Sequence, residues 1–349
     1  MFRRPVRRAG FSLVEVLVAL FIVAAGLIGL LTLFPLGAIQ MGRALQNDRS
    51  QQCALQYDGK ARLYWRSSWV EGGSYDTVLA ALDDADGALP AFAAVGQNER
   101  LASYPVMLDP LGVASYPATL KRQQVAFASG GVFPRKTLGS LATSTLAFRY
   151  ATLQDDMEFG PNGLPADRDG VDVTTAGQSI VRAGRYNCAA VFQRPDNSNR
   201  TVADLKILVF DRRVPGVDPT GANENELMFP RAGIDPNPVQ VTVGSTQVVL
   251  PALNDTLGLR QGAWIMDGTI TQRPPGGTGI RNANFYKVVS FAEDTVAGTT
   301  TVELHIPIVK PRGDSTVAAY NANLYILREL IDVYDRPQLT PTGYLKQSP

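Results

Sequence analysis

Glu15 is the first residue whose chemistry stands out from its surroundings. It is the one charged residue between Phe11 and Phe34, a stretch that is otherwise apolar apart from Ser12, Thr32 and glycines. A carboxylate in hydrocarbon costs on the order of several kcal/mol unless it finds a partner. We therefore expect Glu15 to be functional, with the N-terminus of another chain as its partner.

A second candidate is an acidic segment in the middle of the chain, where aspartates alternate ahead of and behind Gly170. Its three candidate ligands are Asp167, Asp169 and Asp172. Alternating acids with a glycine at the turn allow oxygens to converge on a hard cation. The segment resembles a calcium loop but lacks the final acid of an EF-hand, so a solvated acidic loop is the alternative. Calcium is the only cofactor that the sequence suggests.

The two cysteines, Cys53 and Cys188, are far apart in the sequence. In an oxidising compartment they could form one disulfide that pins a sheet to a helix. Sequence does not give their separation in space, so two buried free thiols are an equal alternative.

Catalytic chemistry is sparse in the rest of the chain. His305 is the only histidine and lies in an alternating run typical of a strand, so no histidine cluster is available for zinc or a catalytic triad. No glycine-rich phosphate loop and no pair of catalytic acids stands out. We therefore expect a protein that is not an enzyme.

Composition excludes two further classes. The chain has 349 residues, of which 45% are hydrophobic and 19% charged, with 33 Lys and Arg against 32 Asp and Glu. It is apolar enough to fold around a core. Its balanced charge, with no basic tract after the first ten residues, argues against nucleic acid as a partner.

The elements that position Glu15 begin with a basic N-terminus. Before Phe11 the chain carries Arg3, Arg4, Arg7 and Arg8 and no acid. The apolar stretch that follows would span about 36 Å as a helix, enough to cross a bilayer core of about 30 Å. The arginines favour an N-terminus on the cytoplasmic side and a head outside. A secretory signal peptide would be shorter, and an ordinary anchor leaves Glu15 unexplained.

These residues resemble the N-terminus of a type IV prepilin or pseudopilin: an arginine-rich leader, Gly10, then Phe11-Ser-Leu-Val-Glu15 ahead of the apolar run. The resemblance covers about a tenth of the chain. It implies that prepilin peptidase cuts after Gly10 and N-methylates Phe11. It also implies that Glu15 pairs with the terminal amine of a neighbouring subunit during assembly.

The same resemblance implies the partners and the location. The partners would be prepilin peptidase, other pilin or pseudopilin subunits, an inner-membrane assembly platform, and membrane lipid before assembly. The chain would first span the inner membrane once, with its head extracytoplasmic, and would then enter a filament at the cell surface or in the periplasm.

The fold expected is α+β, with a long N-terminal helix packed on a mainly antiparallel β-rich head. Residues 1–10 would be the leader, residues 11–72 a membrane and stalk helix of about 60 residues, and residues 73–349 an enlarged head, with a split near residue 235. Pro35 would kink the helix or mark its exit from the membrane. The upper half of the helix shows an apolar stripe at steps of three and four residues, namely Ala54, Tyr57, Ala61, Trp65 and Trp69.

Beyond the helix, the sequence predicts a short helix over 74–84 and a loop-rich region to about residue 180. Strands are then expected at 179–181, 185–193, 203–212, 239–249, 263–267, 285–291, 300–308 and 324–333. Two turns, at 194–199 and 294–298, are typical of β-hairpins.

Two functions compete. The first is a structural pilin-like subunit of a type IV pilus or a type II secretion pseudopilus, with the large head favouring a minor or tip position. The second is an adhesin or ligand-binding head that a pilin stalk displays.

Overall fold

The computed structural model describes the helix and most strands of the head. The described residues are 12–69, 78, 82, 102–111, 124–126, 132–137, 144–153, 185–195, 199, 201–211, 226–229, 239–251, 259–271, 279–313, 316–327 and 329–340. The chain divides into two compact units, Met1–Arg49 and Ser50–Pro349. The second of these units, called the head from here on, contains the β-rich region together with the end of the helix from Ser50, which the sequence analysis placed outside the head.

Helix α1 runs from Leu13 to Trp69, a length of 57 residues. The expected long N-terminal helix is therefore present, and it continues through Pro35. Proline in a helix interior removes one backbone hydrogen bond, because it has no amide hydrogen. Pro35 therefore lies inside the helix, and the kink or the exit from the membrane expected there stays a prediction.

The part of α1 that belongs to the head is amphipathic. Its buried residues include Cys53, Ala54, Tyr57, Ala61 and Trp65, which recur at the spacing of one helical face. The predicted stripe is therefore confirmed as far as Trp65.

The first sheet is built around two long central strands, β4 (Tyr186–Gln193) and β5 (Ala203–Asp211), which form the hairpin expected at 194–199. Its order is β14-β5-β4-β1-β3-β2. The other strands are β1 (Val106–Leu108), β2 (Gln124–Ala126), β3 (Val132–Lys136) and β14 (Leu330–Leu339). Only β1 and β3 pair in parallel among the described strands. A short helix, α4 (Ser144–Ala151), precedes β4.

The second sheet has the order β6-β13-β9-β10-β11-β8, and β12 and β7 form a separate two-stranded sheet. Its strands are β6 (Glu226–Phe229), β8 (Gln247–Pro251), β9 (Trp264–Asp267), β10 (Asn284–Asp294), β11 (Thr299–Leu304) and β13 (Leu324–Leu327). The small sheet pairs β7 (Val239–Thr242) with β12 (Ala319–Ala322). The hairpin expected at 294–298 joins β10 and β11.

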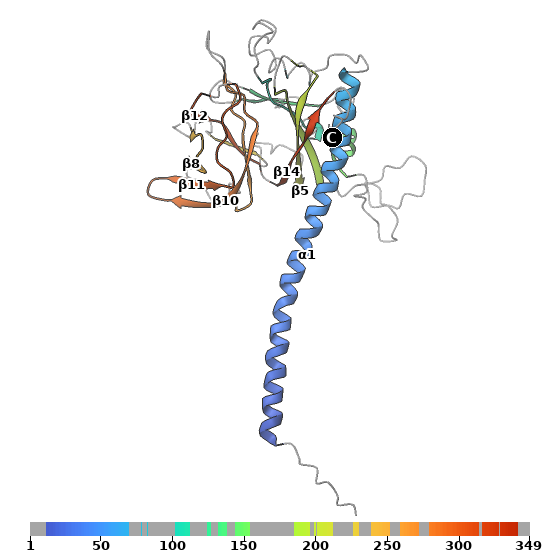
Figure 1. Ribbon diagram of the computed structural model, residues 1–349, viewed down its shortest axis with the longest axis vertical. Coiled ribbons are helices and arrows are strands. Elements are labelled where there is room, and N and C mark those ends of the chain that lie inside the picture. Colours follow the sequence, from blue (N-terminus) through green and yellow to red (C-terminus); the bar gives the residue numbers. More distant parts are fainter. Residues whose placement is uncertain are drawn as a thin grey trace, which may run out of the picture. The chain divides into compact units, whose positions relative to one another are not determined.

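Figure 1 shows the helix and the sheets as ribbons. Three apolar cores hold the sheets and the head part of α1 together. The first lies between the head part of α1 and one face of the first sheet, where Trp65 stacks on Phe192 with ring centroids 6.1 Å apart. The second lies between the two large sheets and contains Phe210 and Trp264. The third lies between the second sheet and the small sheet. The head is thus layered as helix, sheet, sheet and small sheet.

Two expected single strands are each broken by a turn. The run 239–249 divides because Gly244 adopts a left-handed φ of +84°, which favours glycine. The run 324–333 divides at Glu329, a non-glycine residue with φ of +61°. There the chain passes from β13 in the second sheet to β14 in the first.

The region before residue 180 was expected to be loop-rich, and this expectation is wrong for its described part. That part contains three strands and helix α4. These strands have three to five residues, too few to show a period in the sequence. The predicted strand at 179–181 lies outside the described residues. Taken together, the fold is α+β, a long helix followed by a mostly antiparallel β-rich head.

Candidate functional site

Ser12 and Glu15 form a capping arrangement at the start of α1. The Ser12 Oγ accepts a hydrogen bond from the Val14 amide at 3.2 Å, and the Glu15 Oε2 accepts one from the Ser12 amide at 3.2 Å. This reciprocal pattern is a capping box, which satisfies amides that the helix itself leaves unpaired. Glu15 also places its negative charge at the positive end of the helix dipole. Gly10 and Phe11 lie outside the described residues.

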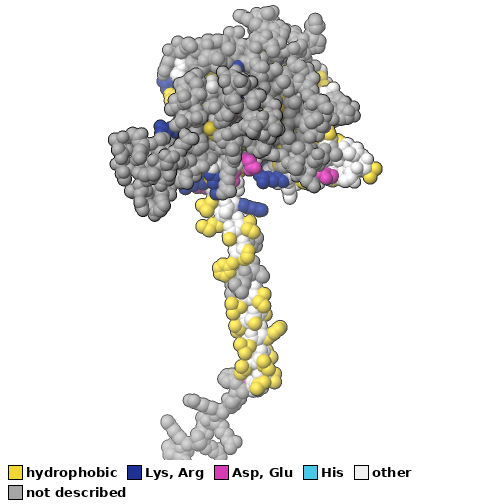
Figure 2. All heavy atoms as spheres, turned by 180° about the vertical axis from the view of Figure 1, so that it is seen from behind, with side chains coloured by type: hydrophobic (Ala, Val, Ile, Leu, Met, Phe, Trp, Pro, Cys, Tyr) yellow, Lys and Arg dark blue, Asp and Glu magenta, His cyan; other side chains and the backbone are white. Residues whose placement is uncertain are grey.

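The first turns of α1 expose apolar side chains on all sides. Figure 2 shows hydrophobic side chains around this part of the helix. The exposed residues include Leu13, Val14, Val16, Leu17, Val18, Leu20, Phe21, Ile22, Val23, Leu27 and Ile28. A helix that is apolar all round is stable only in lipid or against other apolar surfaces.

A membrane span was expected over this stretch. Among the described residues, no helix is both long and apolar enough to be identified as one.

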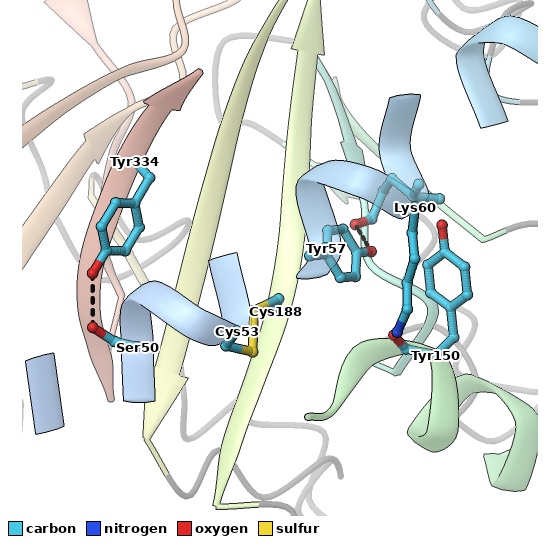
Figure 3. Close-up of a disulfide and its surroundings, with 8 residues drawn as sticks. Ser50, Cys53, Tyr57, Lys60, Tyr150, Cys188 and Tyr334 are labelled. Atoms are coloured by element: carbon cyan, nitrogen blue, oxygen red, sulfur yellow. Dashed lines mark hydrogen bonds between the residues drawn. A yellow bond between two sulfur atoms is a disulfide. The ribbon is translucent and has the colours of Figure 1, made fainter. Parts of the chain in front are cut away.

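The structure joins Cys53 of α1 to Cys188 of β4 by a disulfide (Figure 3). Their Cα atoms are 6.8 Å apart, within the range that a disulfide can bridge. Both residues are buried in the first core. The bond therefore ties the helix to a central strand of the first sheet.

Polar contacts fasten the same helix on either side of the disulfide (Figure 3). The hydroxyls of Ser50 and Tyr334 lie 2.7 Å apart and share a hydrogen bond. The Lys60 Nζ donates to the Tyr150 carbonyl and lies 5.0 Å from the centroid of the Tyr150 ring. Burial raises the pKa of Tyr150 to about 12, so its hydroxyl stays neutral at physiological pH.

Further along α1, the Trp65 Nε1 donates to the Thr201 carbonyl at 2.9 Å. The helix is thus held from Ser50 to Trp65 by strands and loops from distant parts of the chain.

Asp267 is the centre of a buried polar cluster in the second sheet, and the sequence analysis did not predict it. The carboxylate accepts hydrogen bonds from the Thr269 amide and hydroxyl, from the Asn282 Nδ2 at 2.7 Å and from the Tyr320 hydroxyl at 2.6 Å. Burial raises the pKa of Asp267 above its ordinary value of 3.8, although these hydrogen bonds oppose the shift. Burial, and then the Asp267 charge, also raises the pKa of Tyr320.

The raised pKa of Asp267 predicts an unusual pH dependence. Above pH 3.8 the folded chain holds a proton that the unfolded chain has released, so this group's contribution to stability falls as pH rises toward its folded pKa. We expect the wild type to lose up to about 1.4 kcal/mol per pH unit relative to Asp267→Asn over that window. Urea unfolding of both chains between pH 4 and 7 measures the difference.

In that comparison the other titrating groups are common to both chains and cancel. The variant also carries a pH-independent cost, because its amide faces the Asn282 amide. The slope, and not the offset, is therefore the result to examine. A difference that stays constant with pH would show that the pKa of Asp267 is the same in the folded and unfolded chain.

A second group that sequence reasoning missed joins the two large sheets. The Arg281 Nη1 donates to the Ala102 carbonyl at 2.6 Å, and its guanidinium lies 4.4 Å from the centroid of the Tyr104 ring. The Gln193 Nε2 donates to the carbonyls of Arg281 and Ser103 at 2.7 and 3.1 Å. The residues that make these contacts are far apart in the sequence, so no local sequence pattern predicts them.

Of the remaining candidate residues, the structure describes only His305. Asp167, Asp169 and Asp172 lie outside the described residues, and calcium binding stays a prediction. Within the described residues, no group of three His, Cys, Asp or Glu side chains is arranged to hold a metal. His305 follows directly after β11, where its Nδ1 accepts a hydrogen bond from the Lys287 amide at 2.8 Å.

Comparison with known proteins decides the identity of the N-terminus. Residues 6–31 match the family model described as the prokaryotic N-terminal methylation motif. The chain has a type IV prepilin N-terminus. This match includes Gly10, Phe11 and Glu15, and the resemblance inferred from these residues is confirmed. A prepilin N-terminus implies processing by prepilin peptidase, a membrane-anchored N-terminus and assembly with pilin subunits.

The β-rich head of this prepilin-type chain has no informative match. No curated protein sequence matches the chain. Among solved structures, the phage phi92 endosialidase matches at 12% identity with a TM-score of 0.17. The match covers 44% of this chain and 18% of the endosialidase, and at this TM-score it carries no argument about fold or function.

Proposed function

We propose that this chain is a structural pilin-like subunit that prepilin peptidase cuts after Gly10 and N-methylates at Phe11. Before assembly, the apolar N-terminal part of α1 spans the inner membrane once, with the N-terminus in the cytoplasm and the head outside. The subunit then enters a type IV pilus or a type II secretion pseudopilus through this helix, with the help of an inner-membrane assembly platform.

One observation carries the proposal. The methylation motif at residues 6–31 coincides with the start of a helix whose apolar side chains are exposed all round. Such a surface requires lipid or neighbouring helices. A subunit that leaves the membrane for a helical filament exchanges contacts with lipid for contacts with neighbouring helices.

A minor or tip position is the finer part of the proposal. The head contains two large sheets and a small one. A head of this size is difficult to accommodate in a subunit that repeats many times along a filament shaft. We expect few copies of it in each filament.

Mass spectrometry of filaments sheared from producing cells tests the proposal. The expected N-terminal peptide begins at Phe11 and carries one added methyl group on its amine. Its amount relative to the most abundant pilin reports the position, because a minor or tip subunit is present at a small fraction. A membrane-bound chain that still begins at Met1, with no copy in the sheared fraction, would contradict the proposal.

A further inference from the structure

The second sheet ends in a three-stranded ribbon made of β8, β11 and the outer part of β10, residues 288–294. Strand β9 pairs with β10 only from Asn284 to Lys287. Beyond Lys287, the described strand next to β10 is β11 alone. Figure 1 shows the β10 and β11 hairpin projecting from the rest of the second sheet. One long edge of β10 is therefore without a neighbouring strand among the described elements.

The hydrogen-bond pattern shows which backbone groups lie on that edge. The Leu304 amide donates to the Thr246 carbonyl at 2.8 Å, and alternate residues of an antiparallel strand bond to opposite sides. It follows that Val302 and Thr300 bond to β8, whereas Thr301 and Thr299 bond to β10.

Since Thr301 lies opposite Ala292 and Thr299 lies opposite Asp294, these two residues of β10 use their backbone groups toward β11. Phe291 and Glu293 alternate with these two residues along the strand. Their amides and carbonyls therefore point away from the ribbon.

The opposite edge of the ribbon, formed by β8, is protected. The Ser245 Oγ donates to the Gln247 carbonyl and accepts from the Gln247 amide, both at 3.0 Å. Pro251 at the end of β8 has no amide to offer. Short strands, side-chain caps and proline are devices that prevent edge pairing. The β8 edge therefore keeps one uncapped outward position, Val249, between Gln247 and Pro251. The β10 edge presents two outward positions in succession, Phe291 and Glu293, and is the better able to pair.

The side chains along the β10 edge favour a particular partner. Val289 and Phe291 are each 41% exposed, and Val296 at the tip of the hairpin is 97% exposed. Glu293 lies two residues after Phe291, so both point to the same face of the strand. The edge thus presents an apolar side chain next to a carboxylate.

The charge on the ribbon is of one sign. From Val288 to Val309 the sequence contains three acids and no Lys or Arg. Two of the acids are engaged: Glu303 accepts from the Ser290 hydroxyl at 2.7 Å, and Asp294 accepts the amides of the turn. Glu293 has no such bond to a described residue. It remains available to a cation.

We propose that the open edge of β10, from Val289 to Asp294, binds an extended segment of a partner polypeptide as an added strand. Backbone hydrogen bonds to Phe291 and Glu293 supply the pairing. A Lys or Arg of the partner faces Glu293, and an apolar residue two positions away packs on Phe291. A second copy of this chain is disfavoured, because two such edges would bring their acids together. The inference does not depend on how the N-terminus is processed.

A binding experiment with the full chain in detergent micelles tests this. The probe is a fluorescent peptide in which Thr occupies every second position and Lys or Val occupies the positions between. A control peptide has Glu in place of each Lys. Phe291→Pro removes an outward amide without breaking a bond to β11. We expect it to weaken binding of the Lys peptide by at least about tenfold, the effect of roughly one lost hydrogen bond and a steric block.

The matched control is Val249→Pro, which places proline at an outward position of the protected β8 edge. It should bind the Lys peptide as the wild type does. Amide hydrogen exchange should show that the peptide protects Phe291 and Glu293, and Glu293→Gln should reduce the preference for Lys over Glu.

Three results would overturn the proposal. They are equal binding by the Phe291→Pro chain, a loss confined to Val249→Pro, and no protection of the β10 amides at peptide saturation. Self-association that Phe291→Pro abolishes would also overturn it, because the occupant would then be a second copy.

Discussion

A Glu15→Ala chain is expected to be cleaved after Gly10 and retained in the membrane, yet to be at least about tenfold depleted from sheared filaments. This prediction depends on the proposed function. Cleavage creates an ammonium group at Phe11, and a filament buries it among apolar helices. A buried ammonium and a buried carboxylate are each costly alone, and docking in the correct register neutralises both. A tenfold loss corresponds to about 1.4 kcal/mol, well below the cost of one unpaired buried charge.

The capping box gives Glu15 a second role that must be separated from the first. Its Oε2 accepts the Ser12 amide within the same chain, so loss of the carboxylate also weakens the start of the helix. Glu15→Gln keeps an oxygen for that amide but carries no charge. Ser12→Ala removes the serine cap and keeps the charge.

If charge pairing drives assembly, Glu15→Gln will be depleted nearly as strongly as Glu15→Ala, and Ser12→Ala will assemble. Quantitative immunoblots of the sheared and membrane fractions measure both. The reverse order, with Ser12→Ala depleted and Glu15→Gln normal, would assign Glu15 to helix capping alone.

Local patterns predicted the elements that depend on nearby residues. The apolar period at steps of three and four residues located the head part of α1, and runs rich in Val, Ile, Tyr, Phe or Thr located β4, β5, β9 and β10. The breaks inside two runs were missed. Gly244 gave a visible signal, since glycine favours a left-handed turn, whereas Glu329 gave none because its conformation is set by the passage between two sheets.

The candidate site at the N-terminus was predictable because its residues lie within one short segment. The head was different. Asp267 meets Asn282 and Tyr320 only after three separate segments have packed, and the open edge of β10 results from where β9 ends. Such features follow from long-range pairing, which a single sequence does not display.

Removal of both cysteines should cause the largest loss of stability in the head. The two residues are 135 positions apart, and closing a loop of that length restricts the unfolded chain by about 5 kcal/mol at 25 °C in the chain-entropy model. That is a large share of the roughly 5–15 kcal/mol that stabilises a typical domain. We expect a Cys53→Ala and Cys188→Ala chain to unfold at a much lower urea concentration than the oxidised wild type.

Reductant provides the matched control for this prediction. It should destabilise the wild type about as much as the double substitution does and leave the double variant unchanged. Maleimide labelling of the urea-unfolded, unreduced wild type should find no free thiol, and two free thiols would contradict the pairing.

The position of the disulfide also determines how a mechanical load would pass from the helix to the sheet. Cys53 lies close to Ser50, where the head part of α1 begins, and Cys188 lies in a central strand of the first sheet. A tensile force along the helix would therefore be transmitted to the sheet through a covalent bond before it could detach Tyr57 and Trp65 from the core.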